Sequence, residues 1–256
     1  MAGISFLATN LIDEATITVS SGGENAQFPL SNLKNSSPAI KFQSLTDTSV
    51  ILIDMLSNQT VDTVALKGDS TGELGIITAN LRYSNTTDFT GSPVLPITLS
   101  SEFNAGIEFI TEVDARYWEL TLTAGTFCEL GVLYMGKKLN LPQQSYSINS
   151  FRYGYQDKST TRTNEYGQAF INSRNLQKSL SGQIQFATQS ETETLDDMFR
   201  ELGTSRPFWT VVDESSTALS DGKFRFLMYG YLTAVPEWNA TGGRTFNASL
   251  KTREAI

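Results

Sequence analysis

Apolar side chains recur at every second position in several segments of the chain, which is the spacing of a half-buried β-strand. Residues 115–122 show this best, because Trp118, Leu120 and Leu122 alternate with polar or amphipathic neighbours. Gly, Asn and Pro separate further short segments with strand character, at residues 15–20, 50–54, 61–66, 80–84 and 129–135. Short strands between turn residues, with no helical period among them, predict a β-sandwich or jelly roll for the N-terminal half.

One segment in the C-terminal half has the period of a helix instead. Residues 190–203 carry four apolar side chains at positions i, i+3, i+4 and i+7, namely Leu195, Met198, Phe199 and Leu202. Ser190 is expected to cap the first free amides, with Glu193 completing a capping box. Gly203 suits the left-handed position that ends a helix. The sequence therefore predicts one α-helix at about residues 190–203.

Further strands are predicted in the C-terminal half. Residues 176–186 and 245–250 alternate between apolar and polar positions, residues 207–212 form a compact buried strand, and residues 223–232 form a second long strand. Strands, one helix and then more strands indicate a helix laid across a sheet, as in an α+β sandwich or split barrel. The predicted fold class is mainly β throughout: an N-terminal β-sandwich jelly roll and a C-terminal β-sandwich or split barrel that carries the helix.

The charge distribution divides the chain into two parts. Residues 1–140 carry 15 acidic and 7 basic side chains, whereas residues 141–256 carry 12 of each. This shift favours a domain boundary, so we expect a jelly-roll domain at residues 1–138 and a second β domain at residues 139–256. Nucleic acid is not expected as a partner, because Lys and Arg form no cluster. No apolar run reaches the ~20 residues of a membrane helix, and no signal peptide is expected.

The chain contains no histidine, which excludes Ser-His-Asp and Cys-His nucleophilic sites and every zinc site that uses histidine. Its one cysteine, Cys128, is expected to be a buried, inert thiol. Asp196 and Asp197 are adjacent on the predicted helix and point about 100° apart, so they do not form a carboxylate pair. We therefore expect no enzymatic activity, no catalytic residue and no cofactor.

Five short motifs of the N-terminal half occur in a recognisable order: residues 28–33 (Phe-Pro-Leu-Ser-Asn-Leu), 61–66 (Val-Asp-Thr-Val-Ala-Leu), 81–84 (Leu-Arg-Tyr-Ser), 116–120 (Arg-Tyr-Trp-Glu-Leu) and 129–134 (Glu-Leu-Gly-Val-Leu-Tyr). This order resembles the discoidin-like, or galactose-binding-like, jelly roll, and more closely the version found in virion proteins of tailed phages. In those proteins a Thr-x-Trp-Arg-Ser element follows the Ser-Asn-Leu segment. Here residues 39–44 stand in its place, with Phe42 in the aromatic position, where it is expected to fill a core pocket. The strand pattern of the C-terminal half resembles the tail-tube and baseplate-hub modules of the same phages.

The resemblance implies a structural protein of a phage tail tip, baseplate or distal tail. Such a protein would assemble with copies of itself into a ring, contact other tail proteins, and be made in the host cytoplasm before it joins the virion. Residues 156–168 are polar and charged, with no apolar period, which predicts either an exposed loop or the tip of a long hairpin. We expect this segment to be an arm that reaches a neighbour. Tyr155, Arg162 and Trp238 are candidate subunit contacts.

A second hypothesis is a carbohydrate-binding module that attaches to a glycan on the host surface. Tyr83 and Tyr117 are its candidate glycan contacts, because Trp118 shares a face with Leu120 and Leu122 and is expected in the core. Loop carboxylates that could hold calcium are Asp54, Asp62, Asp69 and Glu73, but no calcium-loop spacing is present, and no metal is expected. A glycosidase would need two acids about 5–10 Å apart, and no feature selects such a pair.

Overall fold

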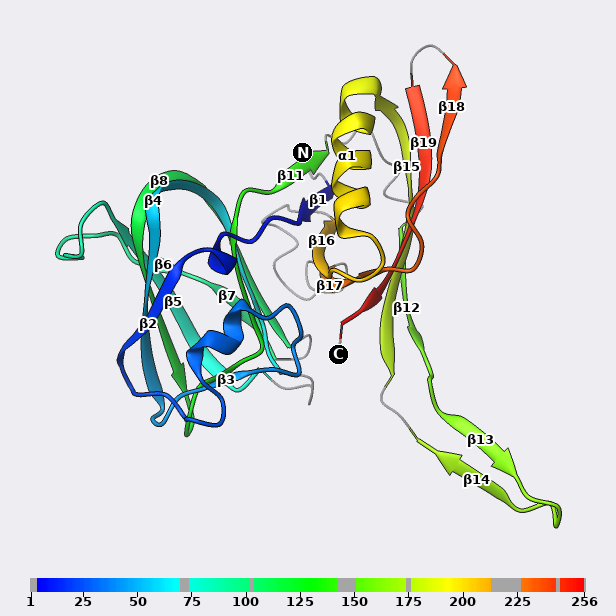
Figure 1. Ribbon diagram of the computed structural model, residues 1–256, viewed down its shortest axis with the longest axis horizontal. Helices are drawn as coiled ribbons and strands as arrows, with labels where there is room; N and C mark the ends of the chain where they lie inside the picture. The colour runs from blue at the N-terminus through cyan, green and yellow to red at the C-terminus, as the bar shows by residue number, and fades with distance from the viewer. Residues whose placement is uncertain are drawn as a thin grey trace. The chain divides into compact units, whose positions relative to one another are not determined.

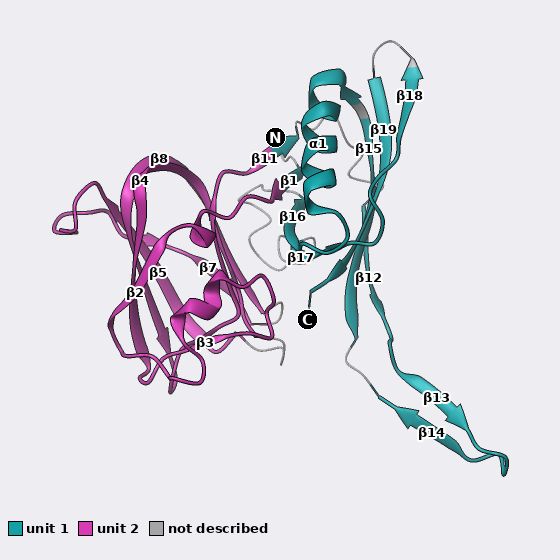
Figure 2. Cartoon of the chain, in the orientation of Figure 1, with its two compact units in different colours: residues 1–5, 140–255 teal, residues 6–139, 256 magenta. Residues whose placement is uncertain are grey.

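The structure is a computed structural model that describes residues 4–69, 74–101, 104–141, 151–173, 176–212, 227–242 and 245–255. Strands dominate these residues, and α1 (Gln189–Leu202) is their only α-helix (Figure 1), which confirms the mainly β class. The chain divides into two compact units (Figure 2). We call residues 6–139 the N-terminal unit, and residues 140–255 with residues 1–5 the C-terminal unit. None of the described helices is long and apolar enough to span a membrane.

The N-terminal unit is built on a seven-stranded antiparallel sheet in the order β10-β4-β8-β5-β6, with β2 also paired to β4 and β7 to β8. Two short 3-10 helices, η1 (Leu11–Asp13) and η2 (Leu30–Lys34), precede most of these strands. The strands of the unit are β2 (Thr16–Ser21), β3 (Phe42–Gln43), β4 (Thr48–Lys67), β5 (Ile76–Ser84), β6 (Leu95–Pro96), β7 (Thr98–Ser100), β8 (Ala105–Ala124), β9 (Glu129–Leu130) and β10 (Val132–Gly136).

The sheet is folded over at a bend shared by β4 and β8. Their pairing shifts register between Asp54 and Gln59 and again near Val61, so the segments predicted as separate strands at 50–54 and 61–66 are the two halves of β4. Apolar side chains from both sides of the bend form one buried cluster, which makes the unit a sandwich. Trp118 and Phe42 are fully buried in this cluster, as the sequence predicts.

The C-terminal unit contains an eight-stranded sheet in the order β11-β1-β16-β17-β19-β15-β12, with β18 also paired to β19. Its strands are β1 (Ile4–Leu7), β11 (Leu139–Leu141), β12 (Arg152–Gln156), β15 (Gln177–Thr188), β16 (Phe208–Val212), β17 (Leu227–Leu232), β18 (Trp238–Gly242) and β19 (Thr245–Glu254). A further pair, β13 (Thr160–Thr163) and β14 (Ala169–Asn172), forms a separate two-stranded sheet. The first strand of the chain, β1, therefore lies among strands from its C-terminal half.

Helix α1 packs against β15 and β19, as the sequence predicts, but its cap is not Ser190. Thr188 holds that position: its Oγ1 accepts from the amide of Glu191, and the Glu191 carboxylate accepts from the amide of Thr188. Both Thr188-x-x-Glu191 and Ser190-x-x-Glu193 fit the capping pattern, and the first is used because β15 ends at Thr188. Gly203 follows the helix with φ +54° and ψ −146°, which is not the predicted left-handed conformation but a region that is also open essentially to glycine alone.

Strand β15 is buried over only part of the predicted segment 176–186. Leu180 and Ile184 are buried, but Leu176 is 57% exposed, because it precedes the paired residues of the strand. The side chain of Phe186 lies outside the part of the structure that is described. Gly182 is held under the ring of Phe151, where an added Cβ would approach within 2.4 Å of that ring. Glycine at this position lets an aromatic side chain close the sheet surface.

Candidate functional site

The pair β13–β14 is an arm of the C-terminal unit that reaches beyond its main sheet (Figure 1). We define the arm as residues 157–173. Every residue of β13 and β14 is exposed. Three apolar side chains of the arm are also largely in solvent, with Tyr166 82%, Phe170 59% and Ile171 70% exposed. Of the two alternatives predicted for residues 156–168, the structure shows the hairpin; its contact with a neighbour stays a prediction.

The tip of the arm has a defined turn. The side-chain oxygen of Asn164 accepts from the amides of Tyr166 and Gln168, and the Asn164 amide donates to the Gln168 carbonyl. Gly167 has φ +78°, a conformation that glycine adopts without steric cost. This network holds the backbone that presents Tyr166 to solvent.

The three candidate subunit contacts lie in two places. Tyr155 is 55% exposed in β12, the strand that leads into the arm, and it packs edge-on against Tyr153. Arg162 is exposed in β13, opposite Phe170. Trp238 lies in β18, opposite Ala248 of β19, and β18 is not the strand that leads into the arm (Figure 1). Tyr155 and Arg162 are thus associated with the arm, and Trp238 is not.

A first groove lies in the N-terminal unit and contains Tyr83; we call it the Tyr83 groove. It has a volume of about 540 Å³, and β5 to β8 supply its walls. The Tyr83 ring rests on Trp118, with the centroids 5.4 Å apart. Thr98 and Glu108 supply the polar groups, and the Thr98 hydroxyl donates to the Glu108 carboxylate over 2.9 Å. A half-buried aromatic ring beside a carboxylate and a hydroxyl can bind a small polar ligand with apolar faces.

The second candidate glycan contact, Tyr117, does not line this groove. It neighbours Trp118 on β8 and points to the opposite face, where the Arg116 guanidinium lies 4.8 Å from the centre of its ring. The structure therefore does not bring Tyr83 and Tyr117 together.

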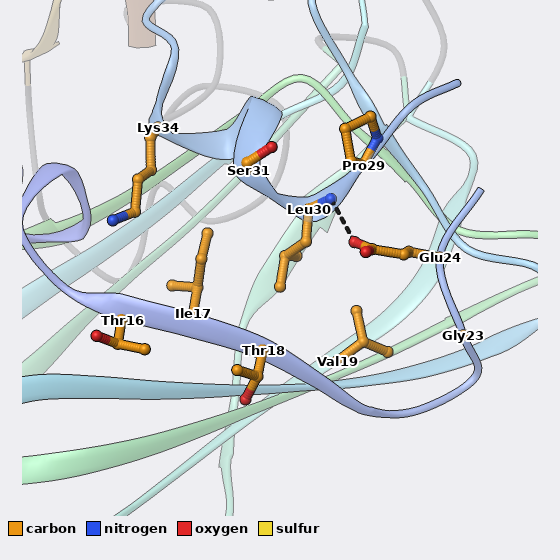
Figure 3. A pocket seen from close by; sticks show the side chains of 10 residues that line it. All are labelled: Thr16, Ile17, Thr18, Val19, Gly23, Glu24, Pro29, Leu30, Ser31 and Lys34. Atoms are coloured by element: carbon orange, nitrogen blue, oxygen red, sulfur yellow. Dashed lines mark hydrogen bonds between the residues drawn. The ribbon is translucent and has the colours of Figure 1, made fainter. Parts of the chain in front are cut away.

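A second groove follows the outer edge of β2 and is lined by residues 16–19, Gly23, Glu24 and one side of η2 (Figure 3). We call it the β2 groove. Its volume is about 620 Å³. The Leu30 amide donates to the Glu24 carboxylate over 2.7 Å, which fixes the entry to η2. Glu24 and Lys34 lie at opposite ends of the groove (Figure 3).

The carboxylates considered as calcium ligands are used elsewhere. Asp54 receives two hydrogen bonds from Arg116, over 2.7 and 2.9 Å, and Asp62 accepts from the Lys138 amide. Asp69 pairs with Lys41, which also contacts Glu129. Burial lowers the pKa of Lys41, but hydrogen bonds to these two carboxylates outweigh it and raise the pKa overall.

The part of the chain that the structure describes contains no group of three or more potential metal ligands. Glu73 lies outside the described residues. On α1, Asp196 pairs with Arg200 one turn later, as expected of a solvated helix face. Cys128 is fully buried, and burial raises the pKa of its thiol, so it is the unreactive thiol that the sequence predicts.

The sequence predicted an exposed segment here but did not single out its exposed apolar side chains, Tyr166, Phe170 and Ile171. A signal was present, because Asn164-Glu-Tyr-Gly167 is a turn sequence between two short segments rich in threonine and apolar residues. For Thr98 and Glu108 there was no such signal. They meet because β7 and β8 pair in a register that no short motif specifies.

No protein-family model matches this chain, and no curated protein matches its sequence. Solved structures are similar to about half of it. The family 32 carbohydrate-binding module from C. perfringens NanJ, in complex with galactose, is 13% identical with a TM-score of 0.43, over 52% of this chain and 98% of that chain. The lectin domain of lectinolysin, complexed with Lewis B antigen, is 14% identical with a TM-score of 0.42, over 51% and 98%.

A third similar structure is chitosan-binding module 1 from a chitosanase/glucanase of Paenibacillus sp. IK-5, at 22% identity and a TM-score of 0.39, over 50% of this chain and 99% of that chain. Similarity at this level adds no argument about the ligand or the activity of this chain. The phage-tail role and the glycan contacts both stay predictions.

Proposed function

We propose that this protein is a structural subunit that assembles with copies of itself through the arm. The observation that carries the proposal is a hairpin with eight exposed strand residues and exposed Tyr166, Phe170 and Ile171 side chains. An isolated two-stranded hairpin is marginally stable in water at best. Exposed apolar side chains on such an element favour a surface that a partner covers.

We propose a head-to-tail contact between subunits. An arm that enters a different surface of the next copy repeats the same heterologous contact, and such contacts close into rings when the rotation permits. The sequence resemblance in both halves supports the tail tip, baseplate or distal tail of a phage as the place of this ring. Other tail proteins would then be its neighbours.

Electron microscopy of the purified protein tests this proposal. We expect closed rings for the wild type and isolated particles for the double variant Tyr166→Ser/Phe170→Ser. The matched control is Ile77→Ser, because Ile77 is 66% exposed on β5, outside the arm; it should still form rings. Isolated wild-type particles at every concentration would rule the proposal out.

A second candidate function is glycan binding in the Tyr83 groove. It is favoured by the arrangement there of an aromatic ring, the Glu108 carboxylate and the Thr98 hydroxyl in about 540 Å³ of space. That volume lies within the ~300–1,000 Å³ range of small-molecule sites. Sugars present both hydroxyl groups and apolar ring faces, so they match this lining. The two functions are compatible, because the arm and the groove belong to different units.

A glycan array tests the second candidate. If a glycan binds, Glu108→Gln and Tyr83→Ala should each weaken binding, because they remove the charged acceptor and the stacking surface. Tyr117→Ala is the control and should bind as the wild type does, since Tyr117 faces away from the groove. Equal loss in Tyr117→Ala would place the binding site elsewhere, and no binding to any glycan would end this candidate.

A further inference from the structure

Strand β2 has one unpaired edge. Its register with β4 runs from Thr16 opposite Asp54 to Ser21 opposite Val50, and no second strand pairs with β2 within the described ranges. The β2 groove follows this edge, since four successive residues, Thr16 to Val19, line it. In an antiparallel pair, alternate residues turn their N–H and C=O groups away from the partner. The groove is therefore bounded by backbone groups available for hydrogen bonding.

The opposite wall of the groove is η2. Figure 3 shows the Leu30 side chain between η2 and β2, and it is 3% exposed. The hydroxyl residues Thr16, Thr18 and Ser31 are all exposed. A trough with an unpaired strand on one side, an apolar floor and a polar rim is suited to an added β-strand.

We propose that the β2 groove receives one strand of the arm from a second copy of the chain. This inference rests on the proposed function and specifies where the arm binds. Strands β13 and β14 have four residues each, which matches the four β2 residues along the groove. Among the residues that the structure describes, no third strand pairs with the arm and no second strand pairs with β2, so one contact would extend both sheets.

Individual charges bear on the orientation of this pairing, because the arm as a whole is neutral. The groove has Glu24 at one end and Lys34 at the other. The arm offers Arg162 and Glu165, three residues apart. Opposite charges at both ends would set the orientation of the arm in the groove.

This contact can be tested by disulfide trapping between two variants, each of which gains one cysteine on its surface. Thr18→Cys and Thr161→Cys variants, carrying tags of different size, are mixed and oxidised. We expect a covalent heterodimer that needs both new cysteines. Wild-type protein should give none, because Cys128 is fully buried. In the matched control, Thr87→Cys takes the place of Thr18→Cys. Thr87 is an exposed threonine in a loop of the same unit, and this pair of variants should give no heterodimer.

A second variant tests the groove without new cysteines. Thr16→Lys/Thr18→Lys places two charges at the exposed edge, a change that blocks strand addition. We expect it to raise the dissociation constant of self-association by about tenfold or more, equivalent to about 1.4 kcal/mol. Circular dichroism and thermal unfolding confirm that the variant is folded.

The outcomes separate this inference from the proposed function. If the disulfide-linked heterodimer forms and the lysine variant assembles more weakly, both the groove contact and arm-mediated assembly are supported. Rings that form normally in the lysine variant, without trapping, overturn the groove contact and leave arm-mediated assembly in place. Wild-type protein that neither assembles nor traps overturns both.

Discussion

Leu56 is the residue at which the long strand β4 bends. It has φ +65°, which is unusual for a residue with a side chain, and it is 58% exposed. The Asp54 carboxylate accepts from its amide over 2.8 Å and is itself held by Arg116. The bend is therefore maintained by side-chain hydrogen bonds at a backbone position that leucine does not favour.

Replacing Leu56 should stabilise the protein. Leu56→Asn is expected to raise the free energy of unfolding by about 1 kcal/mol, because asparagine tolerates positive φ and little packing is lost. Denaturant unfolding measures the change. Leu45→Asn is the control, since Leu45 is 65% exposed and has no positive φ. A Leu56→Asn variant no more stable than this control would contradict the assignment of strain to Leu56.

The same bend makes stability depend on pH. Hydrogen bonds from Arg116, opposed in part by desolvation, hold the pKa of Asp54 below its ordinary value of 3.8. A carboxyl group with a lowered folded-state pKa contributes stability above its unfolded value, and this contribution is lost as pH falls through the folded value. Below pH ~4 the free energy of unfolding of the wild type should therefore fall as pH falls, and part of this decrease should come from Asp54.

Asp54→Asn keeps the acceptor for the Leu56 amide but removes the charge. It should be less stable than the wild type near neutral pH and should lose less stability as pH falls below ~4. Urea unfolding at several pH values measures this slope. Arg116→Met removes the same ion pair and should reduce the slope in the same way. Unchanged slopes in both variants would show that the pair does not contribute to acid unfolding.

The sequence predicts the core position of some residues but not the backbone conformation of others. Trp118 could be placed in the core because it alternates in phase with Leu120 and Leu122. Phe42 could be placed there because it stands in the aromatic position of a motif. The bend at Leu56 could not be predicted, since no glycine or proline marks it. Its cause is the pairing of β4 with β8 across 62 residues of chain, between Asp54 and Arg116.

Among the elements, helix α1 shows the limit of local signals. Its existence, its apolar stripe and its end at Gly203 follow from the sequence, because they depend on residues within one helical turn of each other. Its start does not, since two overlapping capping patterns occur and only the end of β15 selects Thr188. The two halves of β4 were predicted as strands, but their union depends on the partner strand.

The cap assignment can be tested by comparing two similar substitutions. Thr188→Ala should lower the free energy of unfolding by about 1 kcal/mol, because it removes the acceptor for the Glu191 amide. Ser190→Ala should change it by much less, since Ser190 is exposed inside the first turn. Thermal unfolding of the two variants measures the difference. A larger loss in Ser190→Ala would restore Ser190 as the cap.

For the whole molecule, the arm is the feature that fold stability does not explain. All the residues of its two strands are exposed, yet its tip has a specific turn and the arm carries three exposed apolar side chains. The β2 groove is an unfilled edge of the N-terminal unit. Both features are accounted for if copies of the chain assemble with the arm of one in the groove of the next.

Sedimentation velocity across a range of concentrations tests self-assembly through the arm most directly. The account predicts that the wild type sediments as a multiple of its 28.2 kDa mass, and that Tyr166→Ser/Phe170→Ser sediments as a folded monomer at the same concentrations. Wild-type protein that stays monomeric throughout, or an arm variant that assembles as the wild type does, would contradict it.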